Sequence, residues 1–409
     1  MKAGWEVAEL AQVSAVFTDG DWIETKDQAP EGIRLVQTGN IGSGIFKDRR
    51  EKARYIDTAT FERLNCTEVL PGDCLVSRLP DPVGRACLVP QAEEKMVTAV
   101  DCTIIRPDKR KLDPRFLVYY TASHNYLKDI DEQCTGTTRK RISRKNLGKI
   151  PIPLPSLEEQ KQIVAILDEA FECLDRARAN VEANLEDARA FTKAEIDNLF
   201  NKGGKGLSMR KFSEITADTL IGLVRGKKEQ GPGKNYAYVK MNNISNHDSF
   251  DGSDVSRVEC TAEEFGRFCL LPGDFLFNTR NSKELVGKSC VYEGQLSQEL
   301  VFNNNIMRVR FMQGIEARFV ALAFRSRFVK KQLERMKSGT TSVVAIYHKS
   351  LKNLEILLPS HKEQLRVVAQ FSQLDTMTED VRNSYLLQVA DLADLRQSLL
   401  QKAFAGELT

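Results

Sequence analysis

An internal repeat is the feature that most constrains how this chain can fold. Four short motifs recur in the same order after a shift of 201 to 204 residues. They are Val-x-x-x-Asn-Ile at 36–41 and 239–244, Leu-Pro-Gly-Asp at 70–73 and 271–274, Gly-Thr at 136–137 and 339–340, and Pro-Ser with a following Glu-Gln at 155–160 and 359–364. Ordered self-similarity of this kind marks a duplicated architecture. The chain is therefore a tandem duplication in which each copy holds a mixed domain followed by an acidic segment.

The acidic segments are predicted to be long helices over 157–200 and 361–403, which contain no Pro or Gly. Each follows a capping-box pattern, Ser156 with Glu159 and Ser360 with Glu363. Apolar residues follow at spacings close to a heptad: Leu167, Ala170, Leu174, Ala177, Val181, Leu185 and Ala188 in the first, and Phe371, Leu374, Val381, Tyr385, Leu392, Leu395 and Leu399 in the second. Such stripes indicate a coiled-coil seam. A helix of about 45 residues is roughly 65 Å long, too long to pack on one small domain. We expect the two helices to pack antiparallel against each other, with a partner in another chain as the alternative.

The remaining segments predict mixed structure rich in short strands. Apolar runs at 34–37, 74–77 and 102–105 have counterparts at 238–241, 275–278 and 306–309. The Pro-Gly-Asp before each middle run predicts a turn, because Pro presets φ and Gly tolerates positive φ. Helical residues at 114–128 and 315–337 are expected to close each domain. The predicted fold class is α+β, with two pseudo-repeated α/β domains at 1–155 and 203–355 and helical segments at 156–202 and 356–409.

Charge is divided unevenly between these segments. Residues 1–155 hold 24 Lys and Arg against 22 Asp and Glu, and residues 203–355 hold 24 against 16. Residues 156–202 hold 6 against 11, and residues 356–409 hold 5 against 7. Basic segments suit a polyanion, whereas acidic segments would be repelled by one. The alternative, that charge simply varies between solvated faces, stays open for residues 1–155.

Catalytic and metal-binding signals are sparse. Nine cysteines without a Cys-x-x-Cys pair and only four histidines argue against a zinc ribbon or a His-rich metal centre and fit reduced thiols in a cytoplasm. Cys74, Cys87, Cys102 and Cys290 lie in apolar runs and are expected to be inert. Val-Gly-Lys-Ser at 286–289 imitates a P-loop, but Ser282 stands where the first Gly is required. No apolar run approaches the ~18 residues of a membrane span, and no signal peptide is expected. We predict no bound cofactor or metal.

Binding signals are concentrated at two places in each copy. The Gly turn at 136 opens a run of five cations and three hydroxyls ending at Lys145, and residues 78 and 278–283 follow the strand after Pro-Gly-Asp. Cations and hydroxyls bind phosphates, and Arg and Asn can read guanine and adenine edges. Solvated surface is the alternative for each residue. The candidate DNA-binding residues are Arg78, Thr137, Thr138, Arg139, Lys140, Arg141 and Arg144 in the first copy and Asn278, Arg280, Asn281, Lys283, Thr340, Thr341, Ser342, Tyr347 and Lys349 in the second.

With these motifs in order, the chain resembles the specificity subunit of a type I restriction–modification system. The resemblance rests on Leu-Pro-Gly-Asp, on Gly-Thr-Thr leading to Ile-Pro-Ile-Pro-Leu-Pro-Ser-Leu-Glu-Glu-Gln at 150–160, and on Gln-Lys-Ala-Phe-Ala-Gly-Glu-Leu at 401–408. It covers essentially the whole chain, and the ordered, duplicated set is more specific than any single motif.

The resemblance implies two target recognition domains, separated by long antiparallel coiled-coil helices, each reading half of an interrupted sequence in double-stranded DNA. Two methyltransferase (M) subunits would dock on the helices and supply S-adenosylmethionine and N6-adenine chemistry. Restriction (R) subunits would add ATP-driven translocation and cleavage. The chain itself would be a non-catalytic cytoplasmic subunit with no membrane partner.

Three alternatives are compatible with parts of this pattern. The specificity component of a type IIB-like system would look almost the same. A coiled-coil scaffold with no DNA role would not need the basic domain at 203–355. A self-sufficient nuclease or methyltransferase would need a metal-binding carboxylate set or an Asn/Asp-Pro-Pro-Tyr/Phe site, and the latter is absent.

Overall fold

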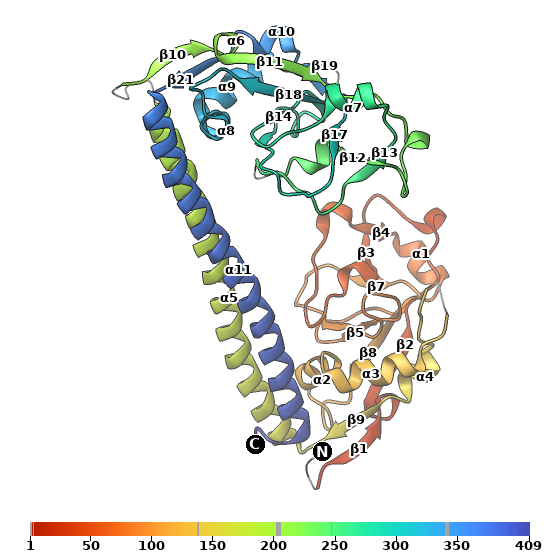
Figure 1. Ribbon diagram of the computed structural model, residues 1–409. Helices are drawn as coiled ribbons and strands as arrows, with labels where there is room; N and C mark the ends of the chain where they lie inside the picture. Colours follow the sequence, from red (N-terminus) through yellow and green to blue (C-terminus); the bar gives the residue numbers. More distant parts are fainter. Residues whose placement is uncertain (1, 3, 137–138, 202–205, 247, 340–342) are drawn as a thin grey trace. The chain divides into compact units, whose positions relative to one another are not determined.

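The computed structural model describes the chain except for residues 1, 3, 137–138, 202–205, 247 and 340–342. The chain divides into two compact units, Met1–Val181 with Leu386–Thr409 (unit 1) and Glu182–Tyr385 (unit 2). Each unit contains a mixed α/β body and parts of two long helices (Figure 1). The predicted α+β class and the duplication are confirmed. The predicted boundaries after residues 155, 202 and 355 stay a prediction, because the compact units divide the chain inside the long helices.

Unit 1 is built on two small sheets. Its antiparallel four-stranded sheet has the order β2 (Ser14–Asp19), β8 (Cys102–Pro107), β5 (Cys74–Ser77), β6 (Ala86–Leu88). Its three-stranded sheet has the order β4 (Arg54–Ile56), β3 (Ile33–Val36), β7 (Met96–Thr98), and β1 (Glu6–Glu9) pairs with β9 (Pro151–Leu154). The α-helices of this body are α1 (Thr58–Arg63), α2 (Pro114–Thr121), α3 (His124–Gln133) and α4 (Arg144–Gly148).

Unit 2 repeats this topology. The four-stranded sheet has the order β11 (Thr216–Ile221), β18 (Ile306–Phe311), β14 (Phe275–Asn278), β16 (Ser289–Val291), and the three-stranded sheet has the order β13 (Ser256–Val258), β12 (Tyr236–Val239), β17 (Leu300–Phe302). β10 (Ser208–Lys211) pairs with β21 (Glu355–Leu358), and a further ribbon joins β15 (Arg280–Asn281), β20 (Val344–Ala345) and β19 (Ser338–Gly339). The helices of this body are α6 (Phe212–Ile215), α7 (Ala262–Phe268), α8 (Ala317–Arg325), α9 (Arg327–Met336) and α10 (His348–Leu351).

Each helical stretch predicted to close a domain is in fact two helices. The break lies at Ser123 in unit 1 and at Ser326 in unit 2. Each serine hydroxyl accepts a hydrogen bond from the backbone N–H three residues later, at 3.4 Å from Tyr126 and 3.3 Å from Val329. The predicted helical residues are thus found in each domain, and a serine in this role divides each stretch by starting a new helix.

The long helices are α5 (Leu157–Leu199) and α11 (His361–Ala405), within two residues of the predicted bounds. In unit 1, Glu159 accepts a hydrogen bond from the Thr409 hydroxyl at 2.9 Å, and Asp175 lies 3.3 Å from Arg396. In unit 2, Tyr385 donates to Glu182 at 3.1 Å, and the hydroxyls of Thr192 and Thr378 are 3.4 Å apart.

In both units, residues further along α5 thus contact residues earlier in the C-terminal segment that includes α11. The prediction that the two helices pair antiparallel within one chain is confirmed. Not every predicted seam residue is buried, since Val381 and Leu395 are 41% and 48% exposed. A helix with 3.6 residues per turn drifts from a strict seven-residue repeat, so one regular stripe cannot stay in the seam over this length.

The start of each long helix is held by a buried glutamine. The Gln160 amide donates to the carbonyls of Lys111 and Pro155 at 2.8 and 2.9 Å and accepts from the Asp113 N–H at 2.8 Å. Gln364 makes the matching three bonds with Gly314, Pro359 and Glu316 in unit 2. The repeated Glu-Gln motif therefore fixes each helix to the body that precedes it.

The end of each long helix completes a core. In unit 1, Leu400 and Phe404 of α11 are buried, and the Phe404 ring meets Phe116 edge-on at 5.2 Å. In unit 2, Ile196 is buried in the core, as is Phe200, which follows α5 and lies 5.4 Å from the ring of Phe319. Burial of large apolar side chains is the main stabilising term at such contacts. No helix in the described part of the chain is long and apolar enough to cross a membrane.

Candidate nucleic-acid interface

The basic turn of unit 1 is a short hairpin leading into α4. The backbones of Thr135 and Arg141 exchange two hydrogen bonds of 2.9 Å. Gly136 has φ +94°, and a Cβ there would lie 2.7 Å from the Arg139 carbonyl oxygen, so the turn requires glycine. The Ser143 hydroxyl then caps α4 by accepting from the Asn146 N–H at 3.1 Å. Thr137 and Thr138 lie outside the described residues.

The cations of this turn fall into two groups. Lys140 pairs with Asp131 at 2.5 Å, which raises the pKa of the lysine, and Arg141 pairs with Asp101 at 3.2 Å. Arg139 and Arg144 are exposed and make no ion pair with the described residues. A cation without a counter-charge has no ion pair to break when it meets a phosphate, whereas a paired one must first give up its partner. Arg139 and Arg144 are therefore the stronger candidates for phosphate contact.

Arg78 is buried, contrary to what its position after a strand predicted. Its side chain is 5% exposed, lies 3.2 Å from Asp19, and donates to the carbonyls of Val100 and Ile142. Burial lowers the pKa of this guanidinium. Arg78 thus holds the end of the basic hairpin from inside, and its burial contradicts the prediction that it contacts DNA.

Asn278 is also buried, with no exposed surface. Its side-chain oxygen accepts from the Arg280 N–H at 3.2 Å. Its side-chain nitrogen has no hydrogen-bond partner among the described residues. A buried amide at this place orients the chain that follows it, and it does not lie at the surface where a base could be read.

The other described candidates of unit 2 gather around the ribbon β15–β20–β19. Arg280 and Asn281 pair with Ala345 and Val344, and the Ile346 N–H donates to the Thr279 carbonyl at 2.9 Å. Tyr347, which is 55% exposed, follows the strand partner of Arg280 by two residues.

Lys349 and Lys283 are exposed on the segments that leave this ribbon. The structure therefore joins, at one ribbon of unit 2, two distant segments that carry exposed Arg, Lys and Tyr side chains. Thr340, Thr341 and Ser342 lie outside the described residues.

Two exposed apolar residues at equivalent positions were missed in the sequence. Trp22 is 69% exposed and Val224 is 68% exposed. Each follows a glycine by two residues, and a Cβ on Gly20 or Gly222 would lie 2.3 Å from a backbone oxygen. The signal was available, because the two segments are related by a shift of 202 residues, close to the period of the repeat.

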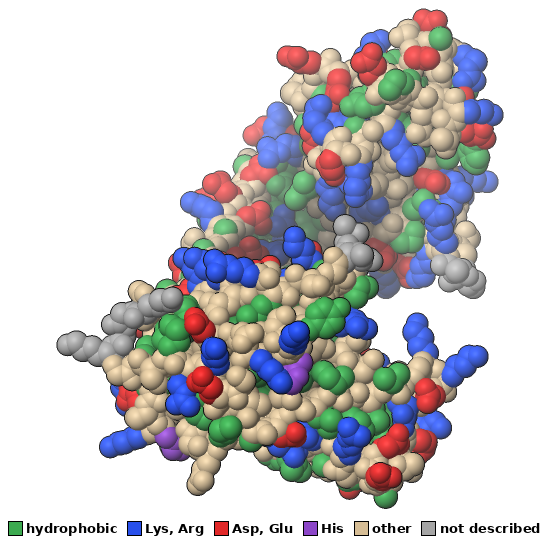
Figure 2. All heavy atoms as spheres, turned by 90° about the horizontal axis from the view of Figure 1, so that it is seen from above, with side chains coloured by type: hydrophobic (Ala, Val, Ile, Leu, Met, Phe, Trp, Pro, Cys, Tyr) green, Lys and Arg blue, Asp and Glu red, His purple; other side chains and the backbone are tan. Residues whose placement is uncertain are grey.

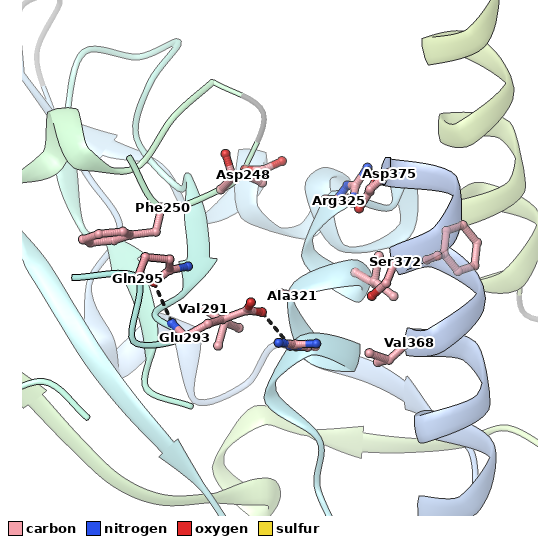
Figure 3. A pocket seen from close by; sticks show the side chains of 14 residues that line it. Asp248, Phe250, Val291, Glu293, Gln295, Ala321, Arg325, Val368, Ser372 and Asp375 are labelled. Carbon is pink, nitrogen blue, oxygen red and sulfur yellow. Dashed lines mark hydrogen bonds and ion pairs between the residues drawn. The ribbon is translucent and has the colours of Figure 1, made fainter. Parts of the chain in front are cut away.

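The hollow in Figure 3 differs in character from a phosphate site. Its volume is about 220 Å³, with Asp248, Phe250 and Gln295 on one side and Val368 and Ser372 of α11 on the other. Both of its arginines are neutralised, Arg318 by Glu293 at 2.5 Å and Arg325 by Asp375 at 2.8 and 3.0 Å.

Burial raises the pKa of the Asp248 carboxyl in the same hollow. With every cation paired and acids in excess, this hollow does not suit an anion. Figure 2 likewise shows basic and acidic side chains intermingled on the face that it displays, so total charge alone does not mark a binding surface.

The thiols expected to be inert lie in the cores. Burial raises the pKa of Cys87 and of Cys102 to about 12 and that of Cys74 and Cys290 in the same direction. A thiol that is not ionised near neutral pH is a poor nucleophile and a poor metal ligand. Among the described residues, no group of three or more His, Cys, Asp and Glu side chains is arranged to hold a metal ion.

Comparison with known proteins places this architecture in a family. The profile of the type I restriction modification DNA specificity domain matches residues 2–186 and 224–388. The chain is 27% identical over 327 residues to the type I restriction enzyme EcoKI specificity subunit of Escherichia coli K12. The aligned residues cover 75% of this chain and 68% of that protein.

Solved structures show the same fold. A chain from a type I restriction–modification system, solved in work on its complex assembly and conformational transition, superposes with a TM-score of 0.78 at 19% identity, covering 100% of this chain and 99% of that one. The HsdS subunit of Thermoanaerobacter tengcongensis gives 0.57 at 19% identity, covering 100% and 98%. With the profile matching both copies of the repeat, the chain belongs to the type I restriction–modification DNA specificity family.

Proposed function

We propose that this chain is the DNA-reading subunit of a type I restriction–modification complex and that each unit reads one half of an interrupted target. The observation that carries the proposal is the duplication itself. Two bodies of the same topology, each with its own set of exposed cations, are joined by a pair of antiparallel helices. Two independent readers in one chain suit a target made of two separated half-sites.

Within each unit, the exposed and unpaired side chains are proposed to contact DNA. In unit 1 these are Arg139 and Arg144, and in unit 2 they are Arg280, Tyr347 and Lys349. Lys140, Arg141, Asn281 and Lys283 stay candidates at the edges of the same surfaces. Phosphate contacts would position each unit, and arginine in the major groove would read guanine.

The long helices are proposed to carry the methyltransferase subunits. Both helices expose large apolar side chains, among them Phe191 (57%) and Met377 (63%) in unit 2 and Leu387 (67%) in unit 1. Where exposed apolar side chains form a contiguous patch, they mark a surface that binds another protein, and we infer such a patch on these helices. The methyltransferase would supply S-adenosylmethionine and the adenine chemistry, and restriction subunits would join that assembly.

A gel-shift and methylation experiment tests this function. The chain alone, the methyltransferase alone and the two together are compared on a library of duplexes with S-adenosylmethionine. We expect sequence-specific binding and methylation with both proteins present, at one interrupted motif. Methylation by the chain alone would contradict the proposal, as would equal methylation by the methyltransferase without the chain.

A further inference from the structure

Unit 1 contains a basic hollow that the sequence analysis did not single out. It has a volume of about 290 Å³ and is lined by Gln37, Thr38, Gly39, Asn40, Arg49, Lys52 and Arg54. The lining thus holds three cations and no carboxylate. It lies where the chain leaves β3 and where it enters β4, two strands that pair in one sheet. The cations therefore all come from residues 49–54, which face the turn at 37–40.

The floor of the hollow is rigid. The Asn40 side chain is buried, accepts from the Gln37 N–H at 3.0 Å and donates to the Lys47 carbonyl at 2.9 Å. Beneath it, the buried Arg85 guanidinium donates to the carbonyls of Thr38 and Ile41 at 2.9 and 2.7 Å. A turn fixed by buried hydrogen bonds loses little conformational entropy when a ligand binds.

The three cations of the hollow have no counter-charge paired with them among the described residues. Arg49 makes one long hydrogen bond of 3.5 Å, from Nη1 to the Gly39 carbonyl, and a Cβ on Gly39 would lie 2.4 Å from that nitrogen. Neither Arg49, Lys52 nor Arg54 forms an ion pair with the described residues. The hydroxyl of Thr38 likewise makes no hydrogen bond within that part of the chain.

In contrast to the cations of the hollow, two neighbouring arginines do form ion pairs. Arg34 and Arg50 both pair with Asp48 and Glu94, and the Arg34–Glu94, Arg50–Asp48 and Arg50–Glu94 distances are 2.9, 2.9 and 3.0 Å. Asp48 and Glu94 are thus used on one side of the loop. The side that faces the hollow keeps its positive charge.

Unit 2 keeps the scaffold of the hollow without its cations. Asn243 repeats the bonds of Asn40, accepting from Lys240 and donating to Asp251, and Lys288 donates to the Ile244 carbonyl as Arg85 does to Ile41. The register of the sheets puts Ser256 where unit 1 has Arg54. No Lys or Arg occurs between Asp251 and Ser256. The turn therefore serves the fold in both units, and the cations are an addition in unit 1.

We propose that this hollow binds a phosphodiester of the DNA backbone and so positions unit 1 on its half-site. The proposal rests on the proposed function, since it assigns one contact of that DNA-reading role. Three unpaired cations and a free hydroxyl around a rigid turn suit a phosphate, and a hollow of this size admits one. Such a contact fixes register and orientation without reading sequence. A free inorganic phosphate presents the same chemistry, so the test separates the two sources.

The test uses the full chain in complex with its methyltransferase. The hollow variant combines Arg49→Gln, Lys52→Gln and Arg54→Gln, and a matched control combines Lys26→Gln, Arg110→Gln and Lys128→Gln. The control removes the same charge from exposed cations that already pair with Glu24, Asp108 and Glu132. Kd for a target duplex is measured from 50 to 300 mM salt, and methylation sequencing records the motif.

We expect the hollow variant to reduce the steepness of log K against log salt by about 0.9, since one phosphate contact is lost and each such contact contributes roughly 0.9. The motif should not change, and the control should keep the wild-type slope. Arg54→Ser, which copies the residue of unit 2 at the same register, should give a smaller decrease in the same direction and guards against a folding defect in the triple variant.

Three results would overturn the inference. One is a wild-type slope in the hollow variant while the wild-type complex binds its target specifically, which would leave the proposed function standing. Another is an equal loss of slope in the control. The third is a thermal shift with inorganic phosphate that the hollow variant abolishes while its DNA binding stays at the wild-type level. A wild-type complex without any sequence preference would instead refute the proposed function.

Discussion

Replacing Gln160 by Leu should destabilise unit 1 much more than the same replacement at a neighbouring exposed position. The side chain has no exposed surface and satisfies three backbone groups, the carbonyls of Lys111 and Pro155 and the N–H of Asp113. Leucine is of similar size, so little volume is lost, but these three groups lose their partner. A buried unsatisfied polar group costs about 1–3 kcal/mol. We expect a loss of about 3 kcal/mol or more, a large fraction of the roughly 5–15 kcal/mol that holds a typical domain.

The chain offers a selective reporter for this measurement. Its two tryptophans, Trp5 and Trp22, both belong to unit 1, so their fluorescence during urea unfolding follows that unit. Gln162→Leu, at an exposed position two residues along the same helix, is the matched control and should change the unfolding free energy by less than about 0.5 kcal/mol. Gln364→Leu removes the equivalent bonds of unit 2 and should lower the urea concentration at which that unit unfolds, as followed by circular dichroism. If Gln160→Leu costs no more than Gln162→Leu, the glutamine does not secure the helix.

Three further predictions follow from the charges, the helices and the thiols. Arg139→Ala and Arg144→Ala should each lower the salt slope of DNA binding by about 0.9, whereas Lys140→Ala should change it less because Asp131 already pairs with that lysine; equal slopes for all three would contradict this. Adding one heptad to both α5 and α11 keeps the seam in register and adds about 10 Å of helix. The stretch of unspecified base pairs between the two half-sites should then grow by about three base pairs, as measured by methylation sequencing. An unchanged stretch would show that the helices do not set this distance. Burial raises the pKa of Cys87 and Cys102 from 9.0 to about 12, so neither should react with a thiol reagent at pH 8 in the folded chain, whereas the exposed Cys173 should. The contribution of these two buried thiols to the free energy of unfolding is present below pH 9 and should be lost as pH rises through 12, which is measured by unfolding at a series of pH values.

The sequence predicted the local structure of this chain well because its signals are local. Ser156 and Ser360 accept the expected capping bonds from Glu159 and Glu363, at 3.3 and 3.4 Å. The middle strands begin and end at the predicted residues, 74–77 and 275–278. The Asp of each Pro-Gly-Asp also proved structural, since it pairs with an arginine on the neighbouring strand. Repetition of a motif thus indicated a requirement of the fold.

The binding surface was harder to predict because it depends on tertiary pairing. Nothing in the run 139–145 distinguishes Arg139 from Lys140, and only the fold brings Asp131 to one and not the other. Arg78 follows a strand as a surface residue would, but the fold buries it against Asp19 and the Ile142 carbonyl. The basic hollow joins a turn at 37–40 with cations at 49–54, and their lack of counter-charges depends on where Asp48 and Glu94 point.

The central claim, that this chain gives a methyltransferase its DNA specificity through two separate readers, is tested most directly by methylation sequencing. Genomic DNA from cells that express the methyltransferase with the wild-type chain is compared with DNA from cells that lack the chain. A third culture carries Arg280→Ala, in unit 2. The account predicts one interrupted motif that needs the chain, and altered preference in only one of its halves for the Arg280 variant. Methylation at the same sites without the chain, or changes in both halves together, would contradict it.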